Sequence, residues 1–199
     1  MIIDSIFIVL AYLSGSVSTA IIVCRLFGLP DPRTEGSRNP GATNVLRFGG
    51  KKAAVITLFG DLLKGYLPVS IAALAGASEL GVAGAALGAF IGHLYPVFFG
   101  FQGGKGVATA FGAILALSPW VAALALITWL LMAAVARTSS LAALTAAALT
   151  PFYLWWFELP ESYIFVVLIM VMLLFWRHRS NIRNLLSGTE QKIGAKNKD

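Results

Sequence analysis

The sequence has few residues of the kinds that build disulfides or metal sites. Cys24 is the single cysteine among 199 residues, so an internal disulfide is excluded. His93 and His178 are the two histidines, which is too few for an all-histidine metal centre. We therefore expect neither a metal nor another cofactor.

Charged side chains are also scarce, at 12% of the chain, whereas soluble domains carry about 25%. Hydrophobic residues make up 58%, which indicates an integral membrane protein. The formal net charge of +6 could suggest a nucleic-acid partner. In a multi-pass membrane protein, however, excess Lys and Arg usually marks cytoplasmic loops, so no nucleic acid is expected.

Seven apolar segments predict an all-α integral membrane protein with seven transmembrane helices and a single domain over residues 1–199. They are Ile6–Phe27, Ala53–Ala75, Val82–Phe99, Val107–Leu117, Trp120–Ala136, Leu141–Phe157 and Ser162–Trp176. The first lacks a basic leader and is interpreted as a retained span, not a signal peptide. Val107–Leu117 would cover only about 16 Å at about 1.5 Å per residue. It could be a half-span, a re-entrant helix, or the start of one helix kinked near Pro119.

The distribution of Lys and Arg predicts the orientation. With seven crossings, the loops 28–52, 100–106 and 137–140 share one face with the C-terminal tail. The opposite face then carries only acidic charges, namely Asp4, Glu79, Glu158 and Glu161. Removing one crossing would expose Arg137 and the basic tail (Arg177, Arg179, Arg183, Lys192, Lys196 and Lys198) on the outside, against the positive-inside rule. We therefore predict a periplasmic N-terminus and a cytoplasmic C-terminus, with the tail against anionic headgroups.

Two patterns inside the spans predict helix packing. Gly84, Gly88 and Gly92 recur every four residues, a spacing that favours close approach of a neighbouring helix. Asp61 and Lys64 lie three residues apart within a span, where an isolated charge is costly, so we expect them to pair. The pair could be purely structural or could lie beside a functional site.

The stretch Gly36–Arg47 combines flexible glycines with polar donors and a cation. Ser37, Thr43 and Asn44 supply donors, and Arg47 follows Asn44 by about one helical turn. If a helix begins near Thr43, its first N–H groups and Arg47 can bind the same anion. The alternative is an ordinary capped helix with an arginine at the lipid headgroups.

The stretch 100–106 is a second candidate phosphate cradle, formed by Gly103, Gly104 and Lys105. It is not a P-loop, because Gly106 follows the lysine where that motif has Ser or Thr. A short helix beginning after Gly106 would point its positive dipole end into the inner half of the membrane, as the broken helices of transporters do.

Either histidine could act as a general base by its ordinary pKa. Soluble-type glycerolipid acyltransferases use a His followed five residues later by Asp, whereas here those positions are Phe98 and Arg183. That mechanism is excluded. A serine triad is not expected either, because the sequence contains no Gly-x-Ser-x-Gly elbow.

The chain resembles the bacterial acyl-phosphate:glycerol-3-phosphate acyltransferases, small integral membrane enzymes of phospholipid synthesis. The resemblance runs nearly end to end through the stretches Tyr12–Ser16, Gly36–Arg47, Gly92–Phe98, Gly103–Thr109, Ser139–Leu141 and Arg177–Asn181. It implies seven transmembrane helices in the bacterial inner membrane, with the active site facing the cytoplasm. It also implies transfer of an acyl group from acyl phosphate to the 1-hydroxyl of sn-glycerol 3-phosphate, giving 1-acylglycerol 3-phosphate (lysophosphatidate) and phosphate.

The resemblance also implies partners and site residues. Partners are glycerol 3-phosphate, acyl phosphate, the lipid bilayer and, transiently, the enzyme that forms acyl phosphate; coenzyme A thioesters are expected to be unused. Catalytic positions are Ser37, Lys105, His178 and Asn181, and phosphate-binding positions are Ser37, Thr43, Asn44, Arg47, Gly103, Gly104, Lys105 and Ser140. In the family that the chain resembles, many members have Gly where this chain has Arg38, and a second Lys where it has Gln102.

The base that removes the hydroxyl proton stays open. Substrate phosphate or His178 could take the proton, and the carboxylates Asp31 and Glu35 lie outside the matched part of their loop. Two other classes of protein compete with the enzyme. A transporter or channel for small phosphorylated solutes would also use broken helices, Gly-rich loops and an intramembrane ion pair. A small assembly protein would not need two cationic loops facing each other.

Overall fold

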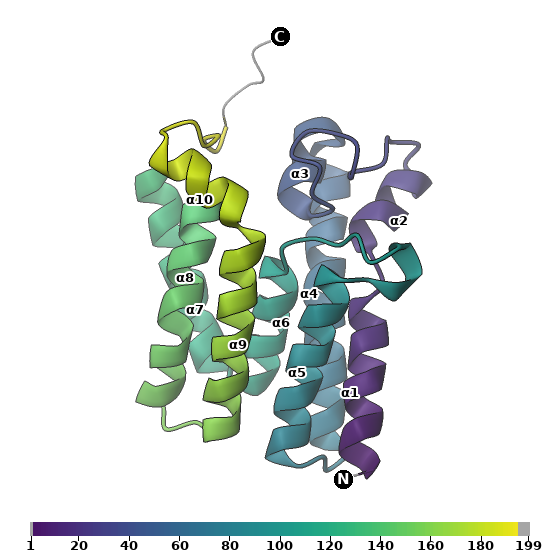
Figure 1. Cartoon of the computed structure of the whole chain (residues 1–199), viewed down its shortest axis with the longest axis vertical. Helices are drawn as coiled ribbons and strands as arrows, with labels where there is room; N and C mark the ends of the chain where they lie inside the picture. The colour runs from purple at the N-terminus through teal and green to yellow at the C-terminus, as the bar shows by residue number, and fades with distance from the viewer. Residues whose placement is uncertain (1, 195–199) are drawn as a thin grey trace. The chain divides into compact units, whose positions relative to one another are not determined.

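A computed structural model describes residues 2–194, which form helices and connecting loops without a strand (Figure 1). The all-α prediction is therefore confirmed for these residues. Lys196 and Lys198 of the predicted basic tail lie outside the described residues. The chain divides into two compact units, Met1–Ser118 and Pro119–Asp199.

The first unit contains six α-helices and a short 3-10 helix: α1 (Ile2–Gly15), α2 (Thr19–Leu26), α3 (Ala42–Phe48), α4 (Gly50–Leu74), α5 (Glu79–Leu94), η1 (Val97–Phe99) and α6 (Val107–Leu117). The second unit contains α7 (Pro119–Ala136), α8 (Ser139–Trp156), α9 (Glu161–Arg177) and α10 (Arg179–Leu186).

The seven predicted apolar segments coincide with helices, but the first is interrupted at residues 16–18, between α1 and α2, and the third at residues 95–96, between α5 and η1. Several are long enough to cross a membrane. Four stretches of the described chain pass on length and hydropathy: Ile2–Leu26, Gly50–Leu74, Glu79–Phe99 and Pro119–Ala136. A fifth is obtained if α9 and α10, which are bent by 60° relative to each other, count as one span. The structure thus supports a multi-pass membrane protein, and the predicted number of seven crossings stays a prediction.

The short helix α6 has the bounds that the sequence predicts, Val107–Leu117. Gly106 precedes it with φ of +85°, a conformation that favours glycine. Ser118 ends it in an extended conformation, with φ −160° and ψ 112°, and α7 begins at the next residue. A continuous helix through Pro119 is therefore excluded.

Helices α1 and α5 pack closely along the predicted glycine face. A methyl group at Gly88 would collide with the Ile8 carbonyl oxygen, and one at Gly92 would collide with the Tyr12 carbonyl oxygen. Gly15 on α1 lies against the backbone of Ala89 in the same way. The absence of side chains lets the two backbones touch, which confirms the predicted packing role.

Two loops of the first unit lie towards the same end of it, opposite the N-terminus (Figure 1). We call residues 27–41 the first loop and residues 100–106 the second loop. Tyr12 helps to place the second, because its hydroxyl donates to the Tyr95 carbonyl at 3.0 Å, just before η1. In the second unit, the start of α8 and the tail after α10 lie together, since Ile193 N donates to the Arg137 carbonyl at 2.6 Å.

Candidate active site

The first loop is folded around the side chain of Asn44, which is 1% exposed. Its Oδ1 accepts the Ser37 backbone N–H at 2.9 Å. Its Nδ2 donates to the carbonyls of Pro32 at 2.9 Å and Glu35 at 3.0 Å. Both amide hydrogens of Asn44 are thus used to hold loop backbone. The structure gives this residue an organising position, whereas the sequence suggested a direct phosphate ligand.

The other predicted residues of this region lie at the surface. Helix α3 begins at Ala42, one residue before the predicted start at Thr43. Ser37, Thr43 and Arg47 have exposed side chains. Asn44 therefore holds the loop backbone that carries Ser37, while Thr43 and Arg47 are carried by α3.

Backbone conformation gives a physical reason for the glycine that the family resemblance leads us to expect at position 38. Arg38 has φ of +56°, in the left-handed region that non-glycine residues rarely adopt. A glycine at this position, as the resemblance leads us to expect, would remove that strain.

The second loop packs against the C-terminal end of α5. Gly104 N donates to the His93 carbonyl at 3.1 Å, and a methyl group at Gly104 would collide with His93 Nε2 and lie 3.0 Å from the Pro40 carbonyl oxygen. Gly103 and Gly104 are buried and Lys105 is half-buried. The contact with Pro40 brings the second loop against the first.

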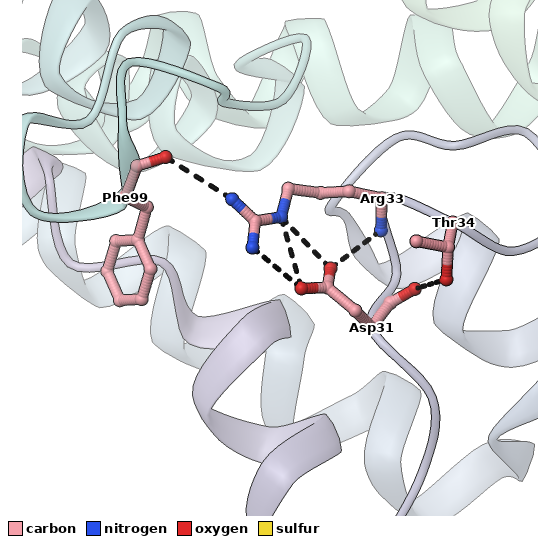
Figure 2. A network of polar contacts seen from close by, with 4 residues as sticks. All are labelled: Asp31, Arg33, Thr34 and Phe99. Carbon is pink, nitrogen blue, oxygen red and sulfur yellow. Dashed lines mark hydrogen bonds and ion pairs between the residues drawn. The ribbon is translucent and has the colours of Figure 1, made fainter.

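A salt bridge within the first loop makes a further connection to Phe99, the last residue of η1 and the one before the second loop, as Figure 2 shows. Arg33 Nη2 lies 2.7 Å from Asp31 Oδ2, and Arg33 Nη1 donates to the Phe99 carbonyl at 3.3 Å. The Arg33 backbone N–H also donates to Asp31 Oδ1 at 2.9 Å. Because both carboxylate oxygens of Asp31 are engaged, this residue serves the connection to Phe99 and is a poor candidate for the general base.

The Asp31–Arg33 pair predicts an acid-dependent loss of stability. The Arg33 guanidinium, hydrogen-bonded to Asp31, holds the pKa of that carboxyl below its ordinary value. The pair therefore stabilises the fold fully above the unfolded-state pKa of about 3.9, and this contribution is lost as pH falls through the lower folded-state pKa. Since both side chains are about 30% exposed, we expect about 0.5 kcal/mol.

The measurement is thermal unfolding in detergent of the wild type and Asp31→Asn at pH 7 and over pH 2–4. The variant is expected to be slightly less stable at pH 7 and to converge with the wild type at the acid end. A difference that grows on acidification would contradict this assignment.

The buried ion pair predicted in α4 is confirmed. Lys64 Nζ lies 2.8 Å from Asp61 Oδ1 and donates to the Val17 carbonyl at 2.8 Å. Val17 lies at the break between α1 and α2, where its carbonyl is outside regular helix. His93 adjoins the pair, with Nδ1 3.7 Å from Asp61 Oδ1.

In the second unit the structure joins Ser140 and Asn181 through Glu190. Ser140 Oγ and Asn181 Nδ2 each donate to Glu190 Oε1 at 2.6 Å. Sequence reasoning missed Glu190; the available signal was a carboxylate in a predominantly basic tail. Its position couples the tail to the start of α8.

His178 lies at the junction of α9 and α10 and is 3% exposed. Its Nδ1 lies 2.9 Å from the Leu174 carbonyl. A carbonyl can only accept, so Nδ1 carries the hydrogen and Nε2 is the basic atom of the neutral ring. This tautomer suits a base that acts through Nε2.

The predicted site residues thus form two groups. Within the first unit, the first loop lies against the second at Pro40–Gly104; Ser37 lies in the first loop, Thr43, Asn44 and Arg47 on α3, and Gly103, Gly104 and Lys105 in the second loop. Within the second, Ser140 and Asn181 share Glu190, and His178 precedes Asn181 by about one helical turn.

Comparison with known proteins identifies the family. The model of the glycerol-3-phosphate acyltransferase family matches residues 5–188. The glycerol-3-phosphate acyltransferase of Thioalkalivibrio sulfidiphilus is 57% identical over 199 residues, covering 100% of this chain and 98% of the relative. That of Methylobacillus flagellatus is 55% identical over 193 residues, covering 97% and 98%.

Two crystal structures of PlsY (YgiH), an integral membrane glycerol 3-phosphate acyltransferase, are also similar. The glycerol 3-phosphate form has a TM-score of 0.92 and 40% identity, covering 96% of each chain. The lysophosphatidic acid form has a TM-score of 0.90 and 38% identity, covering 96% of this chain and 95% of that one. On the matches of sequence and fold together, this chain belongs to the glycerol-3-phosphate acyltransferase family.

Proposed function

We propose that this chain transfers an acyl group from acyl phosphate to the 1-hydroxyl of sn-glycerol 3-phosphate, the first acylation of phospholipid synthesis. The observation that carries the proposal is that two glycine-rich cationic loops meet at Pro40–Gly104, with a second bond from Arg33 to Phe99 just before the second loop, in a chain of this family. The relatives with solved structures were crystallised in forms with glycerol 3-phosphate and lysophosphatidic acid, which are the acceptor and the product of such a transfer.

The chemistry requires little beyond positioning and charge neutralisation. Acyl phosphate is a mixed anhydride and is already activated. The acceptor hydroxyl oxygen attacks the carbonyl carbon, the bond from that carbon to the phosphate oxygen breaks, and phosphate leaves with the electron pair. Cations and backbone N–H groups suit the positioning of the reactants, because they hold two anions together. They also suit charge neutralisation, because they stabilise the negative charge that develops during the reaction.

In this proposal Lys105 and Arg47 bind phosphate, assisted by Ser37, Thr43 and the backbone of Gly103 and Gly104. Asn44 holds the first loop in shape through its three hydrogen bonds. Ser140 contributes to phosphate binding, and Asn181 contributes to catalysis. These last roles follow from the family resemblance.

The hydroxyl proton passes either to the departing phosphate or to Nε2 of His178. His178→Ala separates the two routes in a single-turnover measurement of lysophosphatidate formation. A histidine base predicts a loss of about a hundredfold or more in rate. Near-normal turnover would eliminate His178 and leave substrate phosphate as the acceptor.

We further propose the arrangement in the cell. The chain forms one catalytic domain with seven crossings, a periplasmic N-terminus and a cytoplasmic C-terminus in the bacterial inner membrane. The basic loops then face the cytoplasm, in keeping with the positive-inside rule. On that face the chain binds glycerol 3-phosphate from solution. There it also makes a transient contact with the enzyme that forms acyl phosphate.

The deciding experiment is phosphate release by purified protein in detergent. With acyl phosphate and glycerol 3-phosphate, release is expected without any membrane gradient, together with lysophosphatidate. Acyl-coenzyme A in place of acyl phosphate is expected to give no product. A transporter or channel for phosphorylated solutes would release no phosphate under these conditions, and that result would overturn the proposal.

A further inference from the structure

Beneath the second loop, three helices of the first unit contribute buried polar side chains to one cluster. Asp61 and Lys64 come from α4, His93 from α5 and Thr109 from the first turn of α6. All four are less than 10% exposed. Polar groups in such a location are costly unless they are paired, so the geometry of the pairing indicates what each residue holds in place.

The α4 side of this cluster is a fixed platform. Lys64 is held from two sides, by Asp61 and by the Val17 carbonyl at the break between α1 and α2. Its own carbonyl accepts the Ser14 hydroxyl at 3.4 Å. The ammonium and carboxylate therefore have fixed positions relative to α1, α2 and α4, and Asp61 presents its Oδ1 towards His93.

His93 joins this platform to both ends of the segment Gly104–Thr109, with Lys105 between them. At one end, the His93 carbonyl accepts Gly104 N–H at 3.1 Å, and the ring edge at Nε2 lies against Gly104. At the other end, His93 Nδ1 lies 3.1 Å from Thr109 Oγ1. One buried residue thus spans the turn that carries Lys105 and leads into α6.

We propose that His93 is a positioning residue that, through Thr109 and Gly104, fixes the second loop for binding of the glycerol 3-phosphate phosphate group. The inference rests on the proposed function for the identity of the ligand. His93 itself lies behind the loop and is given no contact with substrate. Its loss changes where Lys105 sits, so the affinity for phosphate falls more than the rate of the chemical step.

The mildest variant is Thr109→Val, which removes the hydroxyl and keeps the shape of the side chain. We expect the KM and the dissociation constant for glycerol 3-phosphate to rise about tenfold, with kcat changed less, because small displacements of positioning groups have large effects. Thr109→Ser restores the hydroxyl and is expected to restore affinity to within about twofold. His93→Asn keeps a polar atom near the place of Nδ1 and is expected to bind better than His93→Ala.

The matched control is Thr150→Val. Thr150 is equally buried, at 2% exposure, but among the described residues its hydroxyl is bonded within its own helix, to the Ala146 carbonyl at 2.8 Å. Binding is measured by calorimetric titration of glycerol 3-phosphate into purified protein, and thermal unfolding is recorded for each variant. Affinity lost in Thr109→Val, regained in Thr109→Ser and unchanged in Thr150→Val is the expected pattern.

Unchanged affinity in Thr109→Val and His93→Ala would overturn the inference, whatever their melting temperatures. So would equal losses of affinity in Thr109→Val and Thr150→Val, because those would reflect general destabilisation. If the wild type binds glycerol 3-phosphate but does not use acyl phosphate, the proposed function fails while this comparison still decides the role of His93.

Discussion

Lys105→Met lowers kcat/KM for acyl transfer by about a hundredfold or more, as the proposed site predicts. Lys105 lies between Gly104 and Gly106 in the second loop, two residues before the start of α6, and it is half-buried. A cation fixed there neutralises phosphate in a setting partly shielded from water, where loss of one such group typically costs 10²–10³ in rate, or about 2.7–4 kcal/mol. Methionine has a similar length and no charge, so packing changes little.

Initial rates of phosphate release and of lysophosphatidate formation, measured over both substrate concentrations, test this expectation. Lys105→Arg keeps the charge but not its compact shape, so an intermediate rate is expected. Lys192→Met is the matched control, because Lys192 is exposed in the tail. A Lys105→Met enzyme within about threefold of the wild type would remove the second loop from the proposed site.

Asn44→Asp is expected to abolish most activity, because it disrupts the hydrogen bonds that hold the first loop in its folded conformation. The substitution changes one NH₂ group to an oxygen, which then faces the Pro32 and Glu35 carbonyls with no hydrogen to donate. A buried, unpaired carboxylate is destabilising by about 3–5 kcal/mol, so the loop is expected to open instead. Since Ser37 and Arg47 are displayed on this loop and on α3, substrate affinity is expected to fall by about a hundredfold or more.

Limited proteolysis detects the opening directly, because new cleavage is expected within residues 27–41. Asn184→Asp introduces the same charge at an exposed position of α10 and is the control. If Asn44→Asp is as resistant to protease as the control and keeps its affinity for glycerol 3-phosphate, the organising role of Asn44 is wrong.

Much of the fold was predictable because it depends on local or periodic patterns. Apolar runs placed the helices, and the bounds of α6 followed from Gly106 before it and Pro119 after it. The glycine spacing in α5 predicted close packing, and the cost of charge in a span predicted the Asp61–Lys64 pair, found at 2.8 Å. In each case the residue pattern lies within one helix, so it can be recognised from the sequence alone.

The hydrogen bonds within the loops, and between residues far apart in the sequence, were not predictable. An asparagine amide offers the same donors to a phosphate and to a carbonyl, so Asn44 could not be assigned to the loop backbone from its type. The Arg33–Phe99 bond joins residues 66 positions apart, and Ser140–Glu190 joins residues 50 apart. Contacts of this range depend on how helices pack, which no local pattern specifies.

His93 illustrates the same limit. From sequence, its unperturbed pKa suggested a general base. In the structure its ring lies among Asp61, Thr109 and Gly104, and its carbonyl holds the second loop. A residue's chemistry bounds what it can do, and its neighbours decide which of those things it does.

At the centre of the proposed function, Arg47 on α3 and Lys105 in the second loop bind the phosphate of glycerol 3-phosphate together. Calorimetric titration of glycerol 3-phosphate into the wild type, Arg47→Met, Lys105→Met and the double variant tests it as a double-mutant cycle. If both cations hold the same phosphate, each single change weakens binding and the combined effect departs from the sum of the two by about 1 kcal/mol or more. Additive losses, or full affinity in either single variant, would show that Arg47 and Lys105 do not act on a shared phosphate.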